Sequence, residues 1–348
     1  MSNIIKVGLV GFGLSGKVFH APFIDAHPRF ELRKVVERNH NNSQKIYPNI
    51  NIVRDISDLF IDKEIDLIVI TTPNIFHFEM VKNSLLAGKH VVIEKPFTPT
   101  SQEAKKLINL ANEKKLKLFV YQNRRWDGDF LTIKNLLKNN VLGKLYEYEA
   151  HFDRYSPEQK NNEWREKDIP GSGILFDLGS HLIDQVVSLF GLPNNIEADI
   201  QTQRRESEVD DYFHLIFRYK KLKVILTAGM LVNKIGPKYI LKGTKGEFIK
   251  YGIDPQEEAL KNGNIPKGND WGKDSPQYFG SLKTKISGDI SEKKIETLEG
   301  RYQDFYNNVF EVLEKGYEME VKPEEAVSTI EIIEKAFDSN SKNQSIKI

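Results

Sequence analysis

The stretch "GILFDLGSHLIDQ" holds the residues whose types and spacing are best suited to proton transfer. Asp177, His181 and Asp184 follow one another at intervals of four and three residues, which places them on one face of a helix. A histidine can accept a proton near neutral pH, and Asp177 could fix its orientation. Oxidation of an alcohol by hydride transfer needs such a proton acceptor. Ordinary Asp–His helix pairs have the same spacing, so both interpretations stay open at this point.

Lys95 is a second candidate for this chemistry, in the tripeptide "EKP" that follows the apolar run "HVVI". Its ammonium could hydrogen-bond a substrate oxygen and ease deprotonation of the alcohol. A lone lysine is usually a solvated surface charge, but one held between Glu94 and Pro96 after a buried strand is less free. The sequence has no cysteine, no close histidine pair and no G-x-S-x-G elbow, which favours an oxidation without a metal.

A glycine-rich turn, "GFGLSG", follows the first apolar run and predicts a dinucleotide site. In the pattern G-x-G-x-x-G, Gly11 permits a tight turn, Gly13 lets a pyrophosphate approach the backbone, and Gly16 lets helix and strand pack closely. The N–H groups and positive dipole end at the start of the helix favour phosphate. The remaining residues of the turn are also expected at the cofactor: Phe12, Leu14 and Ser15.

The residue at the end of the second predicted strand should select the nucleotide, and "VVERNH" places Glu37 there. A carboxylate at this point binds the ribose hydroxyls of NAD and repels the 2′-phosphate of NADP. The adjacent Arg38 could stack on adenine or bind that phosphate. The cofactor is therefore NAD or NADP, and Glu37 gives a slight preference for NAD.

Further cofactor contacts are expected at the carboxyl ends of parallel strands, where open α/β sheets bind ligands. "TTPNIFH" and "EKP" each follow a predicted strand. His77 suits a packing role at a helix start as well as a cofactor contact. The expected contacts are Thr71, Thr72, Pro73, Asn74, His77, Glu94, Lys95, Pro96 and Asn123.

Polar and aromatic side chains beyond this sheet could line a polyol site. "YQNRRWDGDF" lies at the predicted domain junction, and "HFDRYSPE" and "NNEWREKD" follow it. The tryptophans could equally be core residues. The substrate-binding candidates are Arg124, Arg154, Tyr155, Trp164 and Arg165.

The order of elements predicts two domains. Continuously apolar strands separated by helices indicate a doubly wound parallel sheet over residues 1–123, with strands at 4–10, 31–37, 66–71, 90–94 and 117–122 and helices at 15–26, 76–87 and 101–115. Consecutive strands from residue 196 to 250 indicate an α+β domain over 124–348 with a mostly antiparallel sheet. It also has helices at 129–139 and 174–190 and a strand at 145–153. Residues 254–300 read as a surface excursion, and helices at 302–315 and 323–341 close the chain and could pack back on the first domain.

Composition excludes several classes of partner. The 348 residues carry 50 basic and 49 acidic side chains, so no overall field favours nucleic acid or a membrane. No signal peptide or membrane span is evident, and there is no cysteine to argue for export. We therefore expect a cytoplasmic protein that binds a small molecule.

Taken together, "GFGLSGKVFHAPF", "TTPNIFH", "AGKHVVIEKPFT", "YQNRRWDGDFLT", "WREK", "FDLGSHLIDQ" and "FIKYGIDPQEEAL" resemble the glucose-fructose oxidoreductase/inositol dehydrogenase/rhizopine-catabolism (Gfo/Idh/MocA) family. The resemblance covers essentially the whole chain. Within the family, the bacterial scyllo-inositol dehydrogenases, which use NADP, are the most similar group.

The resemblance implies a Rossmann domain and a C-terminal domain whose open-faced sheet forms a homodimer or homotetramer interface. It implies that Lys95 is the catalytic lysine, that His181 is the general base paired with Asp177, and that a cis peptide bond precedes Pro96. The substrate would be an inositol, a sugar or another polyol. Two alternatives remain open: a glycosidase that oxidises its substrate transiently with NAD, and a nucleotide-binding regulator without turnover.

Overall fold

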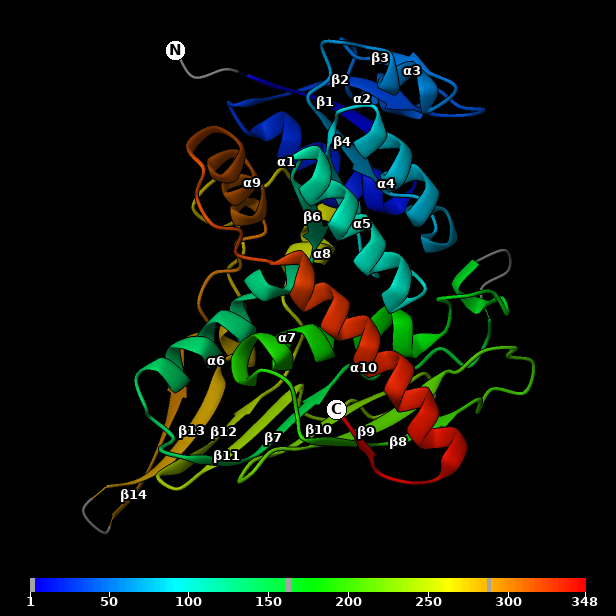
Figure 1. Ribbon diagram of the computed structural model, residues 1–348. Coiled ribbons are helices and arrows are strands. Elements are labelled where there is room, and N and C mark those ends of the chain that lie inside the picture. The colour runs from blue at the N-terminus through cyan, green and yellow to red at the C-terminus, as the bar shows by residue number, and fades with distance from the viewer. Residues whose placement is uncertain (1–3, 160–163, 287–288) are drawn as a thin grey trace. The chain divides into compact units, whose positions relative to one another are not determined.

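The chain forms two compact units (Figure 1). The computed structural model describes residues 4–159, 164–286 and 289–348, so the start of the predicted nucleotide domain and the "NNE" of "NNEWREKD" lie outside the described residues. The first unit comprises Met1–Asn123, Gln256–Trp271 and Arg301–Val327. The second comprises Arg124–Pro255, Gly272–Gly300 and Ser328–Ile348.

The first unit is built on a six-stranded parallel sheet with the order β3-β2-β1-β4-β5-β6. Its strands are β1 (Ile5–Val10), β2 (Phe30–Val36), β3 (Asn51–Val53), β4 (Leu67–Ile70), β5 (His90–Glu94) and β6 (Leu118–Tyr121). β4 and β6 are buried at every position, as a sheet covered on both faces requires. The strand order reverses between β1 and β4, and ligands bind at such a reversal.

Helices cover both faces of this sheet. α4 (His77–Leu86) and α5 (Ser101–Lys114) lie together on one face, and α1 (Ala21–Ala26) and α9 (Gln303–Lys315) lie on the other (Figure 1). Shorter helical segments are η1 (Gly16–His20), α2 (Asn42–Ile46), α3 (Ser57–Phe60), η2 (Asn74–Phe76) and α8 (Gln256–Lys261). The predicted doubly wound fold is confirmed.

The second unit contains a nine-stranded sheet with the order β14-β13-β12-β11-β7-β10-β9-β8-β15. The strands are β7 (Leu145–His151), β8 (Asn195–Gln201), β9 (Tyr212–Arg218), β10 (Lys223–Gly229), β11 (Tyr239–Gly243), β12 (Gly246–Lys250), β13 (Gly280–Ile286), β14 (Asp289–Ile295) and β15 (Ile346–Lys347). β7 and β10 pair in parallel and the other neighbours are antiparallel, so the predicted mostly antiparallel sheet is confirmed.

One face of this sheet packs on helices. Alternate residues of β9 are buried in the core, namely Phe213, Leu215 and Phe217, and the residues between them are half-buried. α6 (Gly128–Lys138) and α7 (Ser180–Phe190) cover the buried face, together with part of α10 (Pro323–Lys342) (Figure 1). The remaining short helical turns are η3 (Asn123–Trp126), η4 (Trp164–Glu166), η5 (Leu175–Gly179) and η6 (Pro276–Tyr278).

One local prediction is wrong, and two predicted helices are present but differ in their first turn. Residues 254–300 are not an irregular excursion, because they contain α8 and the β13–β14 hairpin, which adds two strands to the sheet. β14 is exposed along most of its length, so it has no alternation of apolar and polar residues by which the sequence could reveal it. The predicted helices at 15–26 and 174–190 each begin instead with a π-helical turn, η1 and η5.

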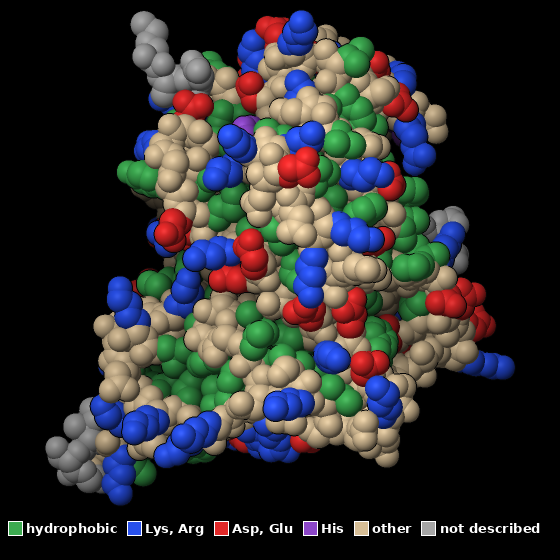
Figure 2. Space-filling model, viewed as in Figure 1, with side chains coloured by type: hydrophobic (Ala, Val, Ile, Leu, Met, Phe, Trp, Pro, Cys, Tyr) green, Lys and Arg blue, Asp and Glu red, His purple; other side chains and the backbone are tan. Residues whose placement is uncertain are grey.

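The surface carries both signs of charge. Lysine and arginine side chains are mixed with aspartate and glutamate in the upper and middle parts of Figure 2, and lysine and arginine predominate along its lower edge. Within the described residues, none of the helices combines the length and apolar character needed to cross a membrane.

Candidate nucleotide and substrate sites

The glycine-rich turn has the geometry that its sequence predicts. Gly11 has a φ of 92°, a conformation that favours glycine. A Cβ at Gly16 would lie 2.2 Å from the Gly11 carbonyl oxygen, so only glycine permits this close packing. The Thr71 hydroxyl donates to the carbonyl oxygens of Val10 and Gly11 at 2.9 and 3.1 Å and braces the turn. At Gly13, an added Cβ would meet no described atom within 4 Å, so the backbone there borders open space.

A cleft of about 650 Å³ opens beside this turn, at the reversal of strand order. Eight predicted cofactor residues line it: Gly11, Phe12, Gly13, Glu37, Arg38, Thr71, Thr72 and Pro73. The sequence reasoning missed the others: Val10, Val36, Asn39, His40, Asn42, Arg54, Asp55, Ile56, Phe76 and Met80. Asn39 and His40 directly follow Glu37 and Arg38, so their position after the second predicted strand could have identified them as cleft residues. Because the backbone at Gly13 borders open space and a cleft adjoins it, this site fits a dinucleotide.

Glu37 is held by the start of α2. Its carboxylate accepts hydrogen bonds from the Asn42 N–H at 3.0 Å, from the Ser43 N–H at 2.7 Å, and from the Ser43 hydroxyl. Glu37 is therefore buried, whereas Arg38 on the same cleft wall is exposed. Arg54 donates to the carbonyl oxygens of Glu37 and His40 at 2.6 and 2.7 Å and so fixes the loop after β2.

His77 connects the two loops that follow β4 and β5. Its Nε2 lies 2.9 Å from the Thr72 carbonyl oxygen, and its Nδ1 lies 3.1 Å from the carbonyl oxygens of Pro96 and Phe97. The residue is buried, and burial lowers its pKa. These contacts give His77 the packing role that the sequence allowed. The Lys95–Pro96 peptide bond is cis, as the resemblance implied.

Lys95 is half-buried at the end of β5. Its backbone N–H donates to the Glu94 carboxylate at 2.9 Å, and the Ser15 hydroxyl donates to the same carboxylate. Donors around Glu94 offset the effect of burial and lower its pKa to about 2. The predicted cofactor residues that lie outside the lining of the cleft are Leu14, Ser15, Gly16, Asn74, His77, Glu94, Lys95, Pro96 and Asn123. Leu14 is exposed, and Asn74 and Asn123 are buried.

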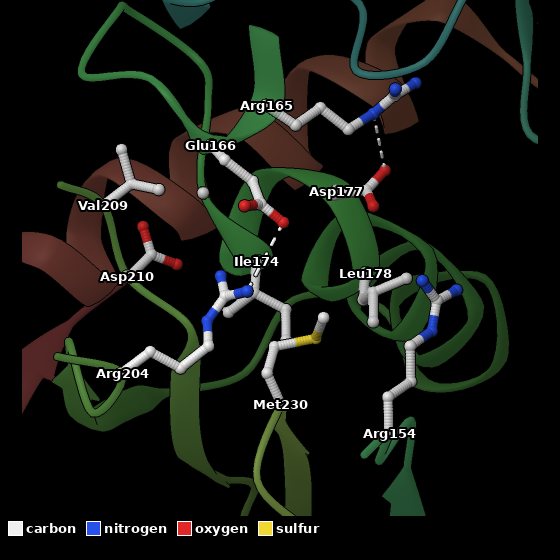
Figure 3. Close-up of a pocket in the computed structure, with 11 residues that line it drawn as sticks. Arg154, Arg165, Glu166, Ile174, Asp177, Leu178, Arg204, Val209, Asp210 and Met230 are labelled. Atoms are coloured by element: carbon white, nitrogen blue, oxygen red, sulfur yellow. Dashed lines mark hydrogen bonds and ion pairs between the residues drawn. The ribbon is translucent and has the colours of Figure 1, made fainter. Parts of the chain in front are cut away.

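A small polar pocket of about 80 Å³ lies in the second unit (Figure 3). Three predicted residues line it: Arg154, Arg165 and Asp177. The Arg165 Nε lies 3.3 Å from the Asp177 carboxylate, and both side chains are partly exposed. The sequence reasoning missed the rest of the lining: Glu166, Gly173, Ile174, Leu178, Arg204, Val209, Asp210 and Met230. Arg204 pairs with Asp211 at 2.9 Å and with Glu166 at 3.4 Å.

The predicted Asp–His face divides between two helical turns. Asp177 lies in the π-helical turn η5 and faces the pocket, whereas His181 and Asp184 lie in α7. His181 is 5% exposed and is not among the residues that line the pocket. Asp184 accepts two hydrogen bonds of 2.7 Å from Arg125, which gives this carboxylate a structural role.

The other substrate-binding candidates differ in whether they line this pocket and in which aromatic rings they contact. The guanidinium carbons of Arg124 and Arg154 lie 4.9 and 5.3 Å from the centre of the Phe152 ring. Arg165 lies 4.7 Å from the centre of the Trp164 ring. Tyr155 is 57% exposed and does not line the pocket. The structure therefore brings Arg154, Arg165 and Asp177 together. Trp164 contacts Arg165 directly, whereas Arg124 contacts the Phe152 ring that Arg154 also contacts.

A Rossmann sheet with a glycine-rich turn and an adjoining cleft defines a dinucleotide-binding protein, and comparison with known proteins shows that it is an oxidoreductase. Residues 5–122 match the family model "Oxidoreductase family, NAD-binding Rossmann fold", and residues 134–348 match "Oxidoreductase family, C-terminal alpha/beta domain". The chain belongs to the Gfo/Idh/MocA oxidoreductase family. The predicted family, and the prediction that the protein is an enzyme of the dehydrogenase type, are confirmed.

Similar proteins span the whole chain. The scyllo-inositol 2-dehydrogenase (NADP(+)) IolW of Bacillus subtilis is 40% identical over 99% of this chain and 96% of its own length. The uncharacterized oxidoreductase YdgJ of Escherichia coli is 42% identical over 97% of both chains. The solved structure of the Bacillus subtilis oxidoreductase yvaA has a TM-score of 0.97 and 39% identity, and covers 100% of this chain and 99% of that one.

Asp210, which lines the polar pocket, should make the stability of the protein depend on pH. Burial raises its pKa to about 6, above the ordinary value of an unfolded aspartate. The contribution of Asp210 to the free energy of unfolding should therefore fall by about 2 kcal/mol as the pH rises from about 4 to about 7, because the folded state holds this proton more tightly than the unfolded state does. The Asp210→Asn variant keeps an acceptor for the Leu175 N–H, which lies 2.7 Å away, but has no proton to lose. Urea unfolding at several pH values should show the free energy of unfolding of the variant rising relative to that of the parent over this interval. The same pH dependence in both proteins would contradict the assignment.

Proposed function

We propose that the protein catalyses the reversible oxidation of a secondary alcohol on a cyclic polyol or sugar, with NADP as the oxidant. The observation that carries the proposal is the polar pocket of the second unit. Guanidinium and carboxylate groups from Arg154, Arg165 and Asp177 line it together, and such groups hydrogen-bond vicinal hydroxyls. His181 follows Asp177 by four residues along the chain.

In the proposed reaction, His181 accepts the proton of the substrate hydroxyl while the carbon-bound hydrogen leaves with its electron pair. When bound, the oxidised nicotinamide ring supplies the acceptor for this hydride at its C4 atom. The Lys95 ammonium donates a hydrogen bond to the substrate oxygen as the carbonyl forms. Asp177 orients His181 or binds a neighbouring hydroxyl. The products are the ketone, the reduced nucleotide and a proton on His181.

The choice of NADP rests on how Glu37 is used. Sequence reasoning slightly favoured NAD because a carboxylate there can bind ribose hydroxyls. Both Glu37 oxygens, however, accept hydrogen bonds from the first residues of α2. Arg38 is the exposed neighbour on the cleft wall, and its guanidinium can bind a 2′-phosphate. The similarity to an NADP-dependent scyllo-inositol 2-dehydrogenase supports the same choice and makes scyllo-inositol the first substrate to test.

The outward face of the nine-stranded sheet supports a further proposal, assembly into a homodimer or homotetramer. Ile216 of β9 lies opposite Ile225 of β10, and both alternate with core residues, so they belong to the outward face. Glu149 lies between Ile225 and Ile240 in the same row across β7 and β11. A partly apolar row of this kind favours contact with a second copy.

A reaction that draws on the cell's nicotinamide nucleotides also fits a cytoplasmic location.

Replacement of His181 tests the reaction. With NADP and a panel of inositols and aldoses, the parent should reduce the nucleotide, and His181→Ala should lower kcat by about 100-fold or more because the proton acceptor is lost. Ser188→Ala, on the exposed side of α7, should keep the parent rate. A parent that binds nucleotide but is silent on the whole panel would favour the regulator. Cleavage of an aryl glycoside without net reduced nucleotide would favour the glycosidase.

Replacement of Arg38 tests the nucleotide preference. Arg38→Ser should lower kcat/KM for NADP by about tenfold or more and leave that for NAD nearly unchanged, because only the contact with the 2′-phosphate is removed. Lys63→Ser removes an exposed charge elsewhere in the first unit and should change neither value. A parent that prefers NAD, with the same preference in Arg38→Ser, would refute the assignment.

The mass of the protein in solution tests the assembly. Light scattering coupled to gel filtration should give two or four times the mass of one chain. Ile225→Arg should lower that mass, because it places a charge in the outward row. Ile61→Arg, at a 78% exposed position of the first unit, is the control and should keep the parent mass. A monomeric parent would rule the proposal out.

A further inference from the structure

A chain of buried polar groups in the first unit has no part in the proposed reaction. His20 is fully buried at the end of the π-helical turn η1. Its Nε2 lies 3.0 Å from the Glu94 carboxylate, and its Nδ1 lies 2.7 Å from the Tyr306 hydroxyl. Tyr306 belongs to α9, far along the chain from the glycine-rich turn. Three separate segments therefore meet at one imidazole.

The partners of His20 define its hydrogen-bonding state. Burial raises the pKa of Tyr306 well above its ordinary value, so its phenol keeps its proton and donates to Nδ1. The Glu94 carboxylate can only accept, so Nε2 carries the ring proton and donates to it. Both ring nitrogens of His20 thus have a hydrogen-bond partner. Its ring also packs against Tyr121, with 4.2 Å between the ring centres, which limits rotation.

Glu94 connects His20 to the glycine-rich turn and to Lys95. The Oε1 atom that accepts from His20 also accepts from the Ser15 hydroxyl in the glycine-rich turn. The other oxygen accepts the backbone N–H of Lys95 at 2.9 Å. The position of the Glu94 carboxylate therefore determines where the Ser15 hydroxyl and the Lys95 backbone are held.

We propose that His20 is a positioning residue that holds the Glu94 carboxylate in place, and through it the backbone of Lys95 and the hydroxyl of Ser15. The inference rests on the proposed function in so far as Lys95 acts on the substrate. It also gives a role to Tyr306 of α9, whose hydroxyl fixes the imidazole.

Two replacements of His20 separate hydrogen bonding from packing. The amide of a glutamine reaches about as far as Nε2, so His20→Gln keeps a donor for Glu94, whereas the shorter His20→Asn does not. His20→Asn should lower kcat by about tenfold, the usual effect of losing a hydrogen bond to a charged group, with a smaller change in the KM for the polyol. His20→Gln should recover most of the rate.

The pH profile gives a readout that loss of packing would not change. Burial by itself raises the pKa of Glu94, and the contact with His20 is the largest effect that lowers it. In His20→Asn the Glu94 pKa should rise, so the carboxylate takes up a proton at a higher pH than in the parent. The kcat of that variant should fall on the acid side at a pH where the parent rate is still constant. His20→Gln should resemble the parent.

The Lys95 amide resonance tests the contact without any turnover. In the parent, the hydrogen bond to Glu94 should shift the Lys95 amide proton downfield and slow its exchange with solvent; in His20→Asn both effects should diminish. Tyr306→Phe should cause a smaller change of the same kind, because it removes the group that fixes the imidazole. Tyr302→Phe removes another buried phenol oxygen from the same segment and should leave the resonance unchanged.

These measurements distinguish failure of the inference from failure of the proposed function. A parent without activity on any polyol would refute the function, while the amide resonances would still decide the role of His20. Equal loss of kcat in His20→Asn and His20→Gln, with parent pH profiles and an unchanged Lys95 resonance, would make His20 a packing residue and overturn the inference.

Discussion

A carboxylate buried at the end of β5 determines how the glycine-rich turn, η1 and the Lys95 backbone are held in the first unit. Glu94 is 8% exposed, and a buried charge is tolerated only when several donors surround it. Those donors come from the glycine-rich turn, from η1 and from the Lys95 backbone. Because they belong to separate segments, satisfying one charge also fixes the segments relative to one another.

The second unit follows the same rule with different partners. Lys238 is buried and lies 2.8 Å from Asp129 in α6, while Asp184 in α7 is paired with Arg125. Removing either partner of such a pair would leave an uncompensated buried charge, so each pair ties a helix firmly to its surroundings. The polar pocket lies next to this fixed framework, because Asp177 belongs to η5, which directly precedes α7. Arg165 and Asp177, which line it, are partly exposed, so they can exchange protein partners for substrate hydroxyls.

Patterns within short stretches of sequence predicted most of the fold. Apolar runs such as "LIVI" identify the buried parallel strands, and the glycine spacing identifies the dinucleotide turn, because both depend on local geometry. The partners of Glu37 could not be predicted in this way, since Asn42 and Ser43 become donors only when the loop after β2 folds back. The Tyr306–His20 contact could not be predicted either, because no local pattern around His20 indicates a contact with a helix almost three hundred residues later.

The two π-helical turns show a further limit of periodicity. η1 ends at His20, and η5 lies just before His181, so each turn leads into a buried histidine. A π-helical turn takes in one more residue than an α-helical turn, which changes the direction of the side chains that follow it. The apolar face of the next helix can then stay on the core while a polar residue at the junction turns inward. An even 3.6-residue pattern predicts the helix but not this change of direction, which in both units occurs at or beside a buried histidine.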